Sequence, residues 1–170
     1  MAAPIYTTGK LEKHHNKVSF DCDIPQLNKY ISEQAGQDMK RNMAITYVLT
    51  ELDSDDVIGY YTLSSANIEL KNLSEQEIKK LPRYPLLPAT LIGRLAVDIK
   101  YQGKGIGELL LIHALKISLE TSSKIAAAAV IVDAKNDRAA QFYQHFGFIR
   151  FPSAPSKLYL LIETVRKLYN

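Results

Sequence analysis

The stretch YQGKGIG places three glycines within five positions, at Gly103, Gly105 and Gly107. Each glycine loses more backbone freedom on folding than alanine does, at a cost of roughly 0.5–1 kcal/mol in regular structure, so the bare backbone must serve a purpose here. The stretch follows the strand-like run LIGRLAVDIK and precedes the helix-like run ELLLIHALKISLE. Because the first N–H groups of a helix and its dipole attract anions, this position predicts a phosphate or pyrophosphate site.

Two common nucleotide signatures do not describe this loop. Its spacing is G-x-G-x-G, whereas dinucleotide-binding folds use G-x-G-x-x-G followed by a ribose-binding acid about 20 residues later. The chain also lacks the pattern G-x-x-x-x-G-K-[ST], so hydrolysis of a nucleoside triphosphate is not indicated. A tight turn between strand and helix that binds no ligand stays open as an alternative.

The composition is that of a globular protein, since 170 residues with 46% apolar side chains can form a hydrophobic core. The longest apolar stretch, IAAAAVIV, is far shorter than the ~20 residues that cross a bilayer, and the N-terminus shows no signal-like apolar segment. We therefore expect one cytoplasmic domain spanning residues 1–170. Cys22, the only cysteine of the sequence, is expected to pack in the core. The net charge of +3 permits a polyanionic partner without requiring one.

Local patterns predict the elements that hold the loop. Helices are expected over about 24–40 with a cap formed by Asp23 and Gln26, over 74–81 with a Ser74 and Glu77 capping box, over 104–122 and over 137–145. Strands are expected over 44–52 and 56–70, which form a hairpin, and over 89–99, 125–134, 146–151 and 156–165. The order of strand 89–99, helix and strand 125–134 predicts a right-handed parallel crossover. The fold class is α/β, or α+β with a mixed sheet.

Two signatures together resemble the GCN5-related N-acetyltransferases, the GNAT superfamily, which use acetyl-coenzyme A. One is Q-x-x-G-x-G at 102–107 after RLAVD, and the other is VDAKNDRAAQFYQHFGF at 132–148. The resemblance implies a GNAT fold, in which helices flank a central, mixed, splayed β-sheet. It also implies acetyl-CoA as the co-substrate, and the sequence offers no convincing metal site.

Nearly the whole chain is similar to the tRNA-acetylating GNAT toxins of type II toxin–antitoxin modules, which acetylate aminoacyl-tRNA and stop translation. The similarity is carried by FDCDIPQLNKYISEQAGQD, VIGYYTLSSANI, IGRLAVDIKYQGKGIGELLL and IVDAKNDRAAQFYQHFGF. Asp23 stands where such toxins commonly have glycine. The similarity implies aminoacyl-tRNA as the substrate, and it suggests a ribbon-helix-helix antitoxin and a homodimer, with no membrane partner.

The resemblance also assigns a cofactor site. Its expected members are Leu95, Ala96, Val97, Gln102, Gly103, Lys104, Gly105, Ile106, Gly107, Asn136, Phe142 and Tyr143. The Val97 N–H is expected to polarise the thioester carbonyl, and ordinary sheet pairing is its alternative role. Asn136 is expected either to cap the helix over 137–145 or to contact pantetheine.

Tyr143 is the candidate general acid. A phenol with a reference pKa of about 10 stays protonated at pH 7 and can donate its proton to a departing thiolate. Helical spacing predicts that Phe142 and Phe146 face the core while Tyr143 turns toward a cleft. Simple packing is the alternative role of Tyr143.

The general base and the acceptor are less well defined. Candidates for the base, by residue type alone, are His14, His15, His113, His145, Asp98, Asp133 and Glu69. Basic residues expected to border the site and to contact tRNA are Lys40, Arg41, Arg83, Arg94, Lys104, Arg150 and Lys157, with solvated surface charge as their alternative role. Two other functions stay open: acetylation of a small amine or a protein amino group, and a non-catalytic domain that binds coenzyme A or a partner.

Overall fold

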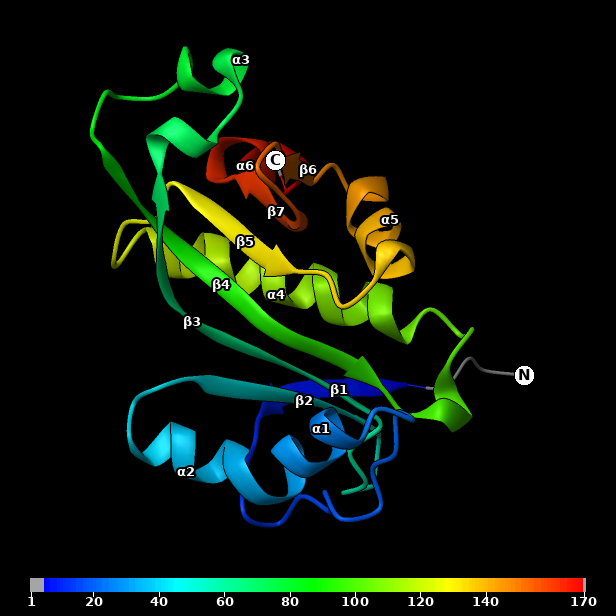
Figure 1. The fold of residues 1–170 in the computed structure, drawn as a ribbon. Coiled ribbons are helices and arrows are strands. Elements are labelled where there is room, and N and C mark those ends of the chain that lie inside the picture. The colour runs from blue at the N-terminus through cyan, green and yellow to red at the C-terminus, as the bar shows by residue number, and fades with distance from the viewer. Residues whose placement is uncertain (1–4, 170) are drawn as a thin grey trace. The chain divides into compact units, whose positions relative to one another are not determined.

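Seven strands form one mixed sheet in the order β1-β2-β3-β4-β5-β7-β6 in the computed structural model, which describes residues 5–169 (Figure 1). The β4–β5 pair is parallel, and the pairs β1–β2, β2–β3, β5–β7 and β6–β7 are antiparallel. This arrangement confirms the predicted mixed sheet and α/β class. Our expectation of a single domain over residues 1–170 stays a prediction.

The chain packs as two units. The first comprises the residues up to Ser64 together with Gly93–Ala114, and the second comprises Ser65–Ile92 and the residues from Leu115 onward. Three elements contribute to both units: β3 (Gly59–Glu69), β4 (Leu86–Val97) and α4 (Ile106–Ser122). Within residues 5–169, no helix combines the length and the apolar character that a bilayer crossing requires.

The first unit contains an antiparallel ribbon covered by a helical segment. Its strands are β1 (Tyr6–Lys10), β2 (Ile45–Glu51) and the beginning of β3. The helical segment consists of α1 (Pro25–Lys29), a π-helical turn (Tyr30–Gln34) and α2 (Ala35–Lys40), and Figure 1 shows α1 and α2 on the same side of β1 and β2. Side chains from both layers, among them Ile31, Ala35, Val48, Tyr60 and Ala96, form one buried cluster.

Two features of the first unit differ from the prediction. Asp23 does not cap the helix: the N-cap is Ile24, which makes no side-chain cap bond, and Pro25 opens the first turn. Asp23 instead has a φ of +67°, in the left-handed region that glycine adopts most easily. Strand β1 was not predicted, because YTTGK is a short, largely polar segment that becomes a strand by pairing with β2.

The second unit contains the parallel crossover and the last antiparallel strands. Its elements are a 3-10 turn (Leu70–Asn72), α3 (Glu75–Ile78), β5 (Ala129–Asp133), α5 (Asp137–His145), β6 (Ile149–Phe151), β7 (Ala154–Leu161) and α6 (Ile162–Leu168). The Ser74 cap is confirmed, since the Ser74 hydroxyl accepts the Glu77 N–H. The predicted strand over 156–165 was wrong beyond Leu161, because Ile162 and Val165 are buried at helical spacing in α6.

Candidate active site

The glycine loop between β4 and α4 has an open backbone. Gly103 and Gly105 have φ values of +78° and +80°, which L-amino acids rarely adopt. A Cβ atom added at either glycine would meet no heavy atom within 4 Å. The next residue, Ile106, is 1% exposed and begins α4. The loop is therefore anchored by a buried side chain while its glycine backbone stays accessible to an anion.

The end of β4 leads directly into this loop. Ala96 is buried in the core of the first unit, so Leu95 and Val97 point to the opposite face of the strand. A 3-10 turn (Ile99–Tyr101) follows, and the Gln102 side-chain amide donates back to the Val97 carbonyl at 3.0 Å. Gln102 thus has a local structural role beside the expected cofactor role, which stays a prediction.

Lys104 supplies a positive charge at the glycine loop, and its ammonium group lies over the ring of Tyr101. The Tyr101 hydroxyl donates to Glu51 Oε1, and this hydrogen bond, with burial as a smaller cause, raises the pKa of Tyr101 to about 12. Lys104 Nζ lies 5.3 Å from the centroid of the Tyr101 ring. The ammonium group is thereby kept near the glycines, where it would attract a phosphate.

The second signature folds as α5, with the predicted boundaries. Asn136 Oδ1 accepts the Ala139 N–H at 2.8 Å, which confirms Asn136 as the helix cap. Gly147, with a φ of +97°, follows the helix end, and the Phe148 N–H donates to the Tyr143 carbonyl at 3.2 Å. A contact between Asn136 and pantetheine stays a prediction.

The predicted orientation of the aromatic residues on α5 was wrong. Tyr143 is only 6% exposed, whereas Phe142 and Phe146 are half-buried and pack edge to face with each other at 5.3 Å. Tyr143 and Ala140 form the buried stripe of this short helix, and the Tyr143 ring also packs against Phe148. Burial, and then the negative charge of Asp133, raise the pKa of Tyr143. Its phenol therefore keeps its proton at neutral pH, as a general acid must.

The basic residues expected at the substrate side fall into two groups. The exposed group is Lys40, Arg41, Arg83, Lys104 and Lys157. Arg94 is instead stacked with its Cζ atom 3.5 Å from the centroid of the Tyr30 ring, and the Tyr30 hydroxyl donates to Asp38 at 2.8 Å. Arg150 donates to the Pro155 carbonyl at 3.1 Å. Arg94 and Arg150 thus have structural contacts that their residue type alone does not indicate.

Several candidate bases have defined partners. His113 Nδ1 and the Tyr61 hydroxyl share a hydrogen bond of 2.6 Å. Asp98 is buried, and both of its carboxylate oxygens accept backbone N–H groups. Asp98 therefore lacks the open position that a general base needs to reach an amine, whereas His113 is half-buried.

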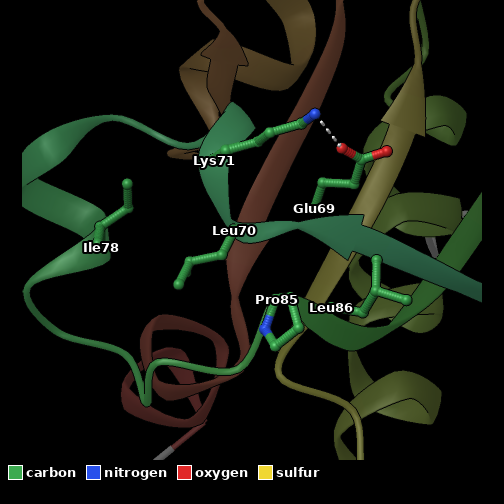
Figure 2. Close-up of a pocket in the computed structure, with 6 residues that line it drawn as sticks. All are labelled: Glu69, Leu70, Lys71, Ile78, Pro85 and Leu86. Atoms are coloured by element: carbon green, nitrogen blue, oxygen red, sulfur yellow. Dashed lines mark ion pairs between the residues drawn. The ribbon is translucent and has the colours of Figure 1, made fainter.

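Glu69 belongs to a pocket of about 450 Å³ in the second unit. The pocket is lined by Glu69, Leu70, Lys71, Ile78, Pro85 and Leu86. Figure 2 shows Glu69 paired with Lys71, and their closest charged atoms are 3.2 Å apart. None of the expected cofactor residues lines this pocket. Among residues 5–169 no group of three or more His, Cys, Asp or Glu side chains could hold a metal ion.

Comparison with known proteins identifies the family. Residues 44–150 match the family described as Acetyltransferase (GNAT) domain. The chain is 30% identical over 161 residues to a probable toxin TacT of Sinorhizobium fredii, covering 91% of this chain and 89% of that protein. It is 31% identical over 150 residues to a tRNA-acetylating toxin of Mycobacterium tuberculosis, with 88% of each covered. The chain therefore belongs to the GNAT acetyltransferases.

Solved structures agree with this assignment over almost the whole chain. A tyrosine-to-phenylalanine mutant of KacT superposes with a TM-score of 0.90 at 28% identity, covering 96% of this chain and 99% of that one. AtaT complexed with acetyl-methionyl-tRNAfMet gives 0.89 at 27% identity, covering 97% and 99%. AtaTR bound with acetyl-CoA gives 0.81 at 25% identity, covering 98% and 99%. The predicted GNAT fold is confirmed.

Proposed function

We propose that this chain is a toxin that transfers the acetyl group of acetyl-CoA to the α-amino group of an aminoacyl-tRNA and so blocks translation. The observation that carries the proposal is the full-length similarity to a tRNA-acetylating toxin, together with the likeness to AtaT complexed with acetyl-methionyl-tRNAfMet. Both likenesses extend well beyond the two acetyl-CoA signatures, since they cover 88% and 97% of this chain.

Acetyl-CoA is bound, in this proposal, by the glycine loop and the end of β4. The loop fits a pyrophosphate because Gly103 and Gly105 leave free the space that a Cβ would fill, and Lys104 adds a positive charge. Leu95, Ala96 and Val97 offer backbone groups to the pantetheine arm, and the Val97 N–H stabilises the charge that develops on the thioester oxygen. Asn136 and Phe142 contact the same co-substrate from the second signature.

The transfer step needs one proton donated and one proton removed. The amine nitrogen forms a bond to the carbonyl carbon while the carbon–sulfur bond breaks, and the Tyr143 hydroxyl gives its proton to the leaving thiolate. The nitrogen loses a proton to water, which then restores the phenol through solvent. Burial keeps Tyr143 protonated, which supports this role. The step requires the Tyr143 hydroxyl to reach the thioester sulfur.

The tRNA contacts are assigned to basic side chains on both units. We propose that these are Lys40, Arg41, Arg83, Arg94, Arg150 and Lys157, four of which are exposed. Each phosphate neutralised releases counterions. The logarithm of the tRNA affinity should therefore fall linearly with the logarithm of the salt concentration, with a slope of about −0.7 to −0.9 per phosphate contact. Acetylation of a small uncharged acceptor should be much less sensitive to salt.

The deciding experiment incubates the protein with total charged tRNA and labelled acetyl-CoA, and analyses the aminoacyl ends by mass spectrometry beside a translation extract. N-acetylated aminoacyl-tRNA together with blocked translation is the expected result. Rapid acetylation of a polyamine or peptide with tRNA untouched would replace this proposal with a small-amine or protein acetyltransferase.

The same similarity supports two proposals about partners. A toxin of this type would be held inactive by a ribbon-helix-helix antitoxin, and it would form a homodimer in the cytoplasm, where translation occurs. Co-purification with the product of the neighbouring gene, and light scattering of the isolated chain, test these two proposals separately.

A further inference from the structure

Asp98 lies between the two elements that we propose to bind acetyl-CoA. It follows Val97 at the end of β4 and precedes the turn that leads into the glycine loop. Its side chain is buried, with 6% exposure. Asp98 Oδ2 accepts the Asp21 N–H at 3.0 Å, and Oδ1 accepts the Lys100 N–H at 2.9 Å. One carboxylate thus joins an N-terminal loop to the turn before the glycines.

Three backbone hydrogen bonds hold the same segment, two to other parts of the chain and one within the turn. The Asp98 N–H donates to the Ile58 carbonyl at 2.9 Å, and the Ile99 N–H donates to the Asp21 carbonyl at 2.8 Å. Within the turn, the Tyr101 N–H donates to the Asp98 carbonyl at 2.9 Å. The path of the chain from Asp98 to Tyr101 is therefore set by contacts with Ile58, just before β3, and with the loop around Asp21.

A second layer of side chains fixes that loop independently of Asp98. Asp21 Oδ1 accepts the Asp23 N–H at 2.9 Å and the Asn28 side-chain amide at 3.0 Å. Asn28 Oδ1 in turn accepts the Cys22 N–H at 2.8 Å. Because these bonds do not involve Asp98, the Asp21 N–H is presented to the carboxylate by a loop that is already ordered.

We propose that Asp98 is a positioning residue for acetyl transfer, which sets the direction of the glycine loop relative to the Val97 N–H. The inference rests on the proposed function, because it assigns a support to the same acetyl-CoA site. A carboxylate suits this place since two separate N–H donors need two acceptor oxygens, and asparagine would offer only one. Asp98 acts through the backbone on either side of it and does not contact the substrate.

The test compares Asp98→Asn and Asp98→Ala with the matched control Ser74→Ala. Ser74 also caps a short helix by accepting a backbone N–H, but it precedes α3 in the second unit, away from the glycine loop in sequence. Calorimetry measures acetyl-CoA affinity, steady-state kinetics measures kcat and both KM values, and thermal unfolding measures stability. The calorimetry requires no acceptor, so it stays informative even if charged tRNA proves not to be the substrate.

We expect Asp98→Asn to weaken acetyl-CoA binding about tenfold, and Asp98→Ala to weaken it further, with the KM for the acceptor unchanged. Ser74→Ala should lower the melting temperature without changing acetyl-CoA affinity. A folded Asp98→Ala variant with wild-type affinity and kcat would overturn the proposal and leave Asp98 a purely structural residue.

Asn28→Ala keeps the proposal testable if Asp98→Ala does not fold. This change removes the hydrogen bonds from Asn28 to Asp21 and from Cys22 to Asn28, and it leaves the Asp98 carboxylate in place. We expect a smaller loss of acetyl-CoA affinity in the same direction, again with the acceptor KM unchanged. Unchanged acetyl-CoA affinity in both Asp98→Asn and Asn28→Ala would equally overturn the proposal.

Discussion

Replacement of Gly105 tests the pyrophosphate site, because the structure separates the cost to folding from the cost to binding. Gly105 has a φ of +80°, and an added Cβ would meet nothing within 4 Å. The cost to folding is therefore conformational rather than steric, about 1–2 kcal/mol for an ordinary L-residue in the left-handed region. Each 1 kcal/mol lowers the melting temperature of a domain of this size by roughly 2–4 °C. Gly105→Val should therefore still fold.

Gly105→Val should weaken acetyl-CoA binding more than it destabilises the fold. A side chain at position 105 fills the space where the anion approaches the main chain, and the loss of one charge-assisted hydrogen bond, about 1.5–3 kcal/mol, weakens affinity tenfold or more. Gly105→Asn isolates this effect, because asparagine tolerates a positive φ but still carries a side chain. Gly9→Ala is the matched control, since an added Cβ there also meets nothing within 4 Å and φ is not positive.

Calorimetry with acetyl-CoA and thermal unfolding are run on all three variants. We expect Gly105→Val and Gly105→Asn to lose affinity by at least about tenfold, with a smaller stability loss for asparagine, and Gly9→Ala to match the wild type in affinity. Wild-type acetyl-CoA affinity in a folded Gly105→Val protein would refute the argument that the glycines are present for the pyrophosphate.

Three further substitutions test other residues. Tyr143→Phe should slow acetyl transfer by ~10² to 10⁴-fold with acetyl-CoA affinity nearly unchanged. Because burial raises the pKa of Tyr143, the wild-type rate should show no loss from ionisation of this phenol below about pH 10. Turnover of the variant at the wild-type rate would make Tyr143 a packing residue. Arg94→Lys keeps the charge but loses the planar contact with Tyr30, so it should lower the free energy of unfolding by about 0.5–2 kcal/mol in urea denaturation. Arg83→Lys, at an exposed position, should leave the free energy of unfolding unchanged. Equal stability of the two variants would contradict the stacking argument. Asp23→Gly should raise the free energy of unfolding by several tenths of a kcal/mol, up to about 1, because Asp23 has a φ of +67°; a less stable protein in the same denaturation experiment would contradict that reasoning.

Elements with strong local signals could be predicted from the sequence. Helix α5 begins and ends where the pattern from Asn136 to Gly147 predicts, because its cap and its terminating glycine act within a few residues. The Ser74 cap is correct for the same reason, although α3 ends at Ile78 and the prediction placed its end at about Leu81. Strand β1 and helix α6 could not be predicted, because the first depends on pairing with β2 and the second on which face of a continuous apolar run is buried.

The candidate site shows the same division between local and tertiary information. The positions of the glycines and of Asn136 follow from spacing alone, and both agree with the structure. The orientation of Tyr143 does not, since helical spacing defines a face but not the side of the helix that other elements cover. The contacts of Arg94 with Tyr30 and of Asp98 with Asp21 join segments more than 60 residues apart, so no local pattern could reveal them.

Among the described residues of the first unit, five have a positive φ, and three of these lie on the two segments that Asp98 joins, while Asn42 and Asp53 lie elsewhere. Asp23 lies on the N-terminal loop, Gly103 and Gly105 lie after the 3-10 turn, and all three have positive φ. The conformation is strained for Asp23 but not for the glycines, and a strained residue persists only where surrounding contacts over-determine it. The Asp98 carboxylate accepts the Asp21 N–H on one segment and the Lys100 N–H on the other. In our proposal this network directs the glycine loop from its N-terminal side, which is the physical reason to expect acetyl-CoA affinity to respond to residues that never touch the co-substrate.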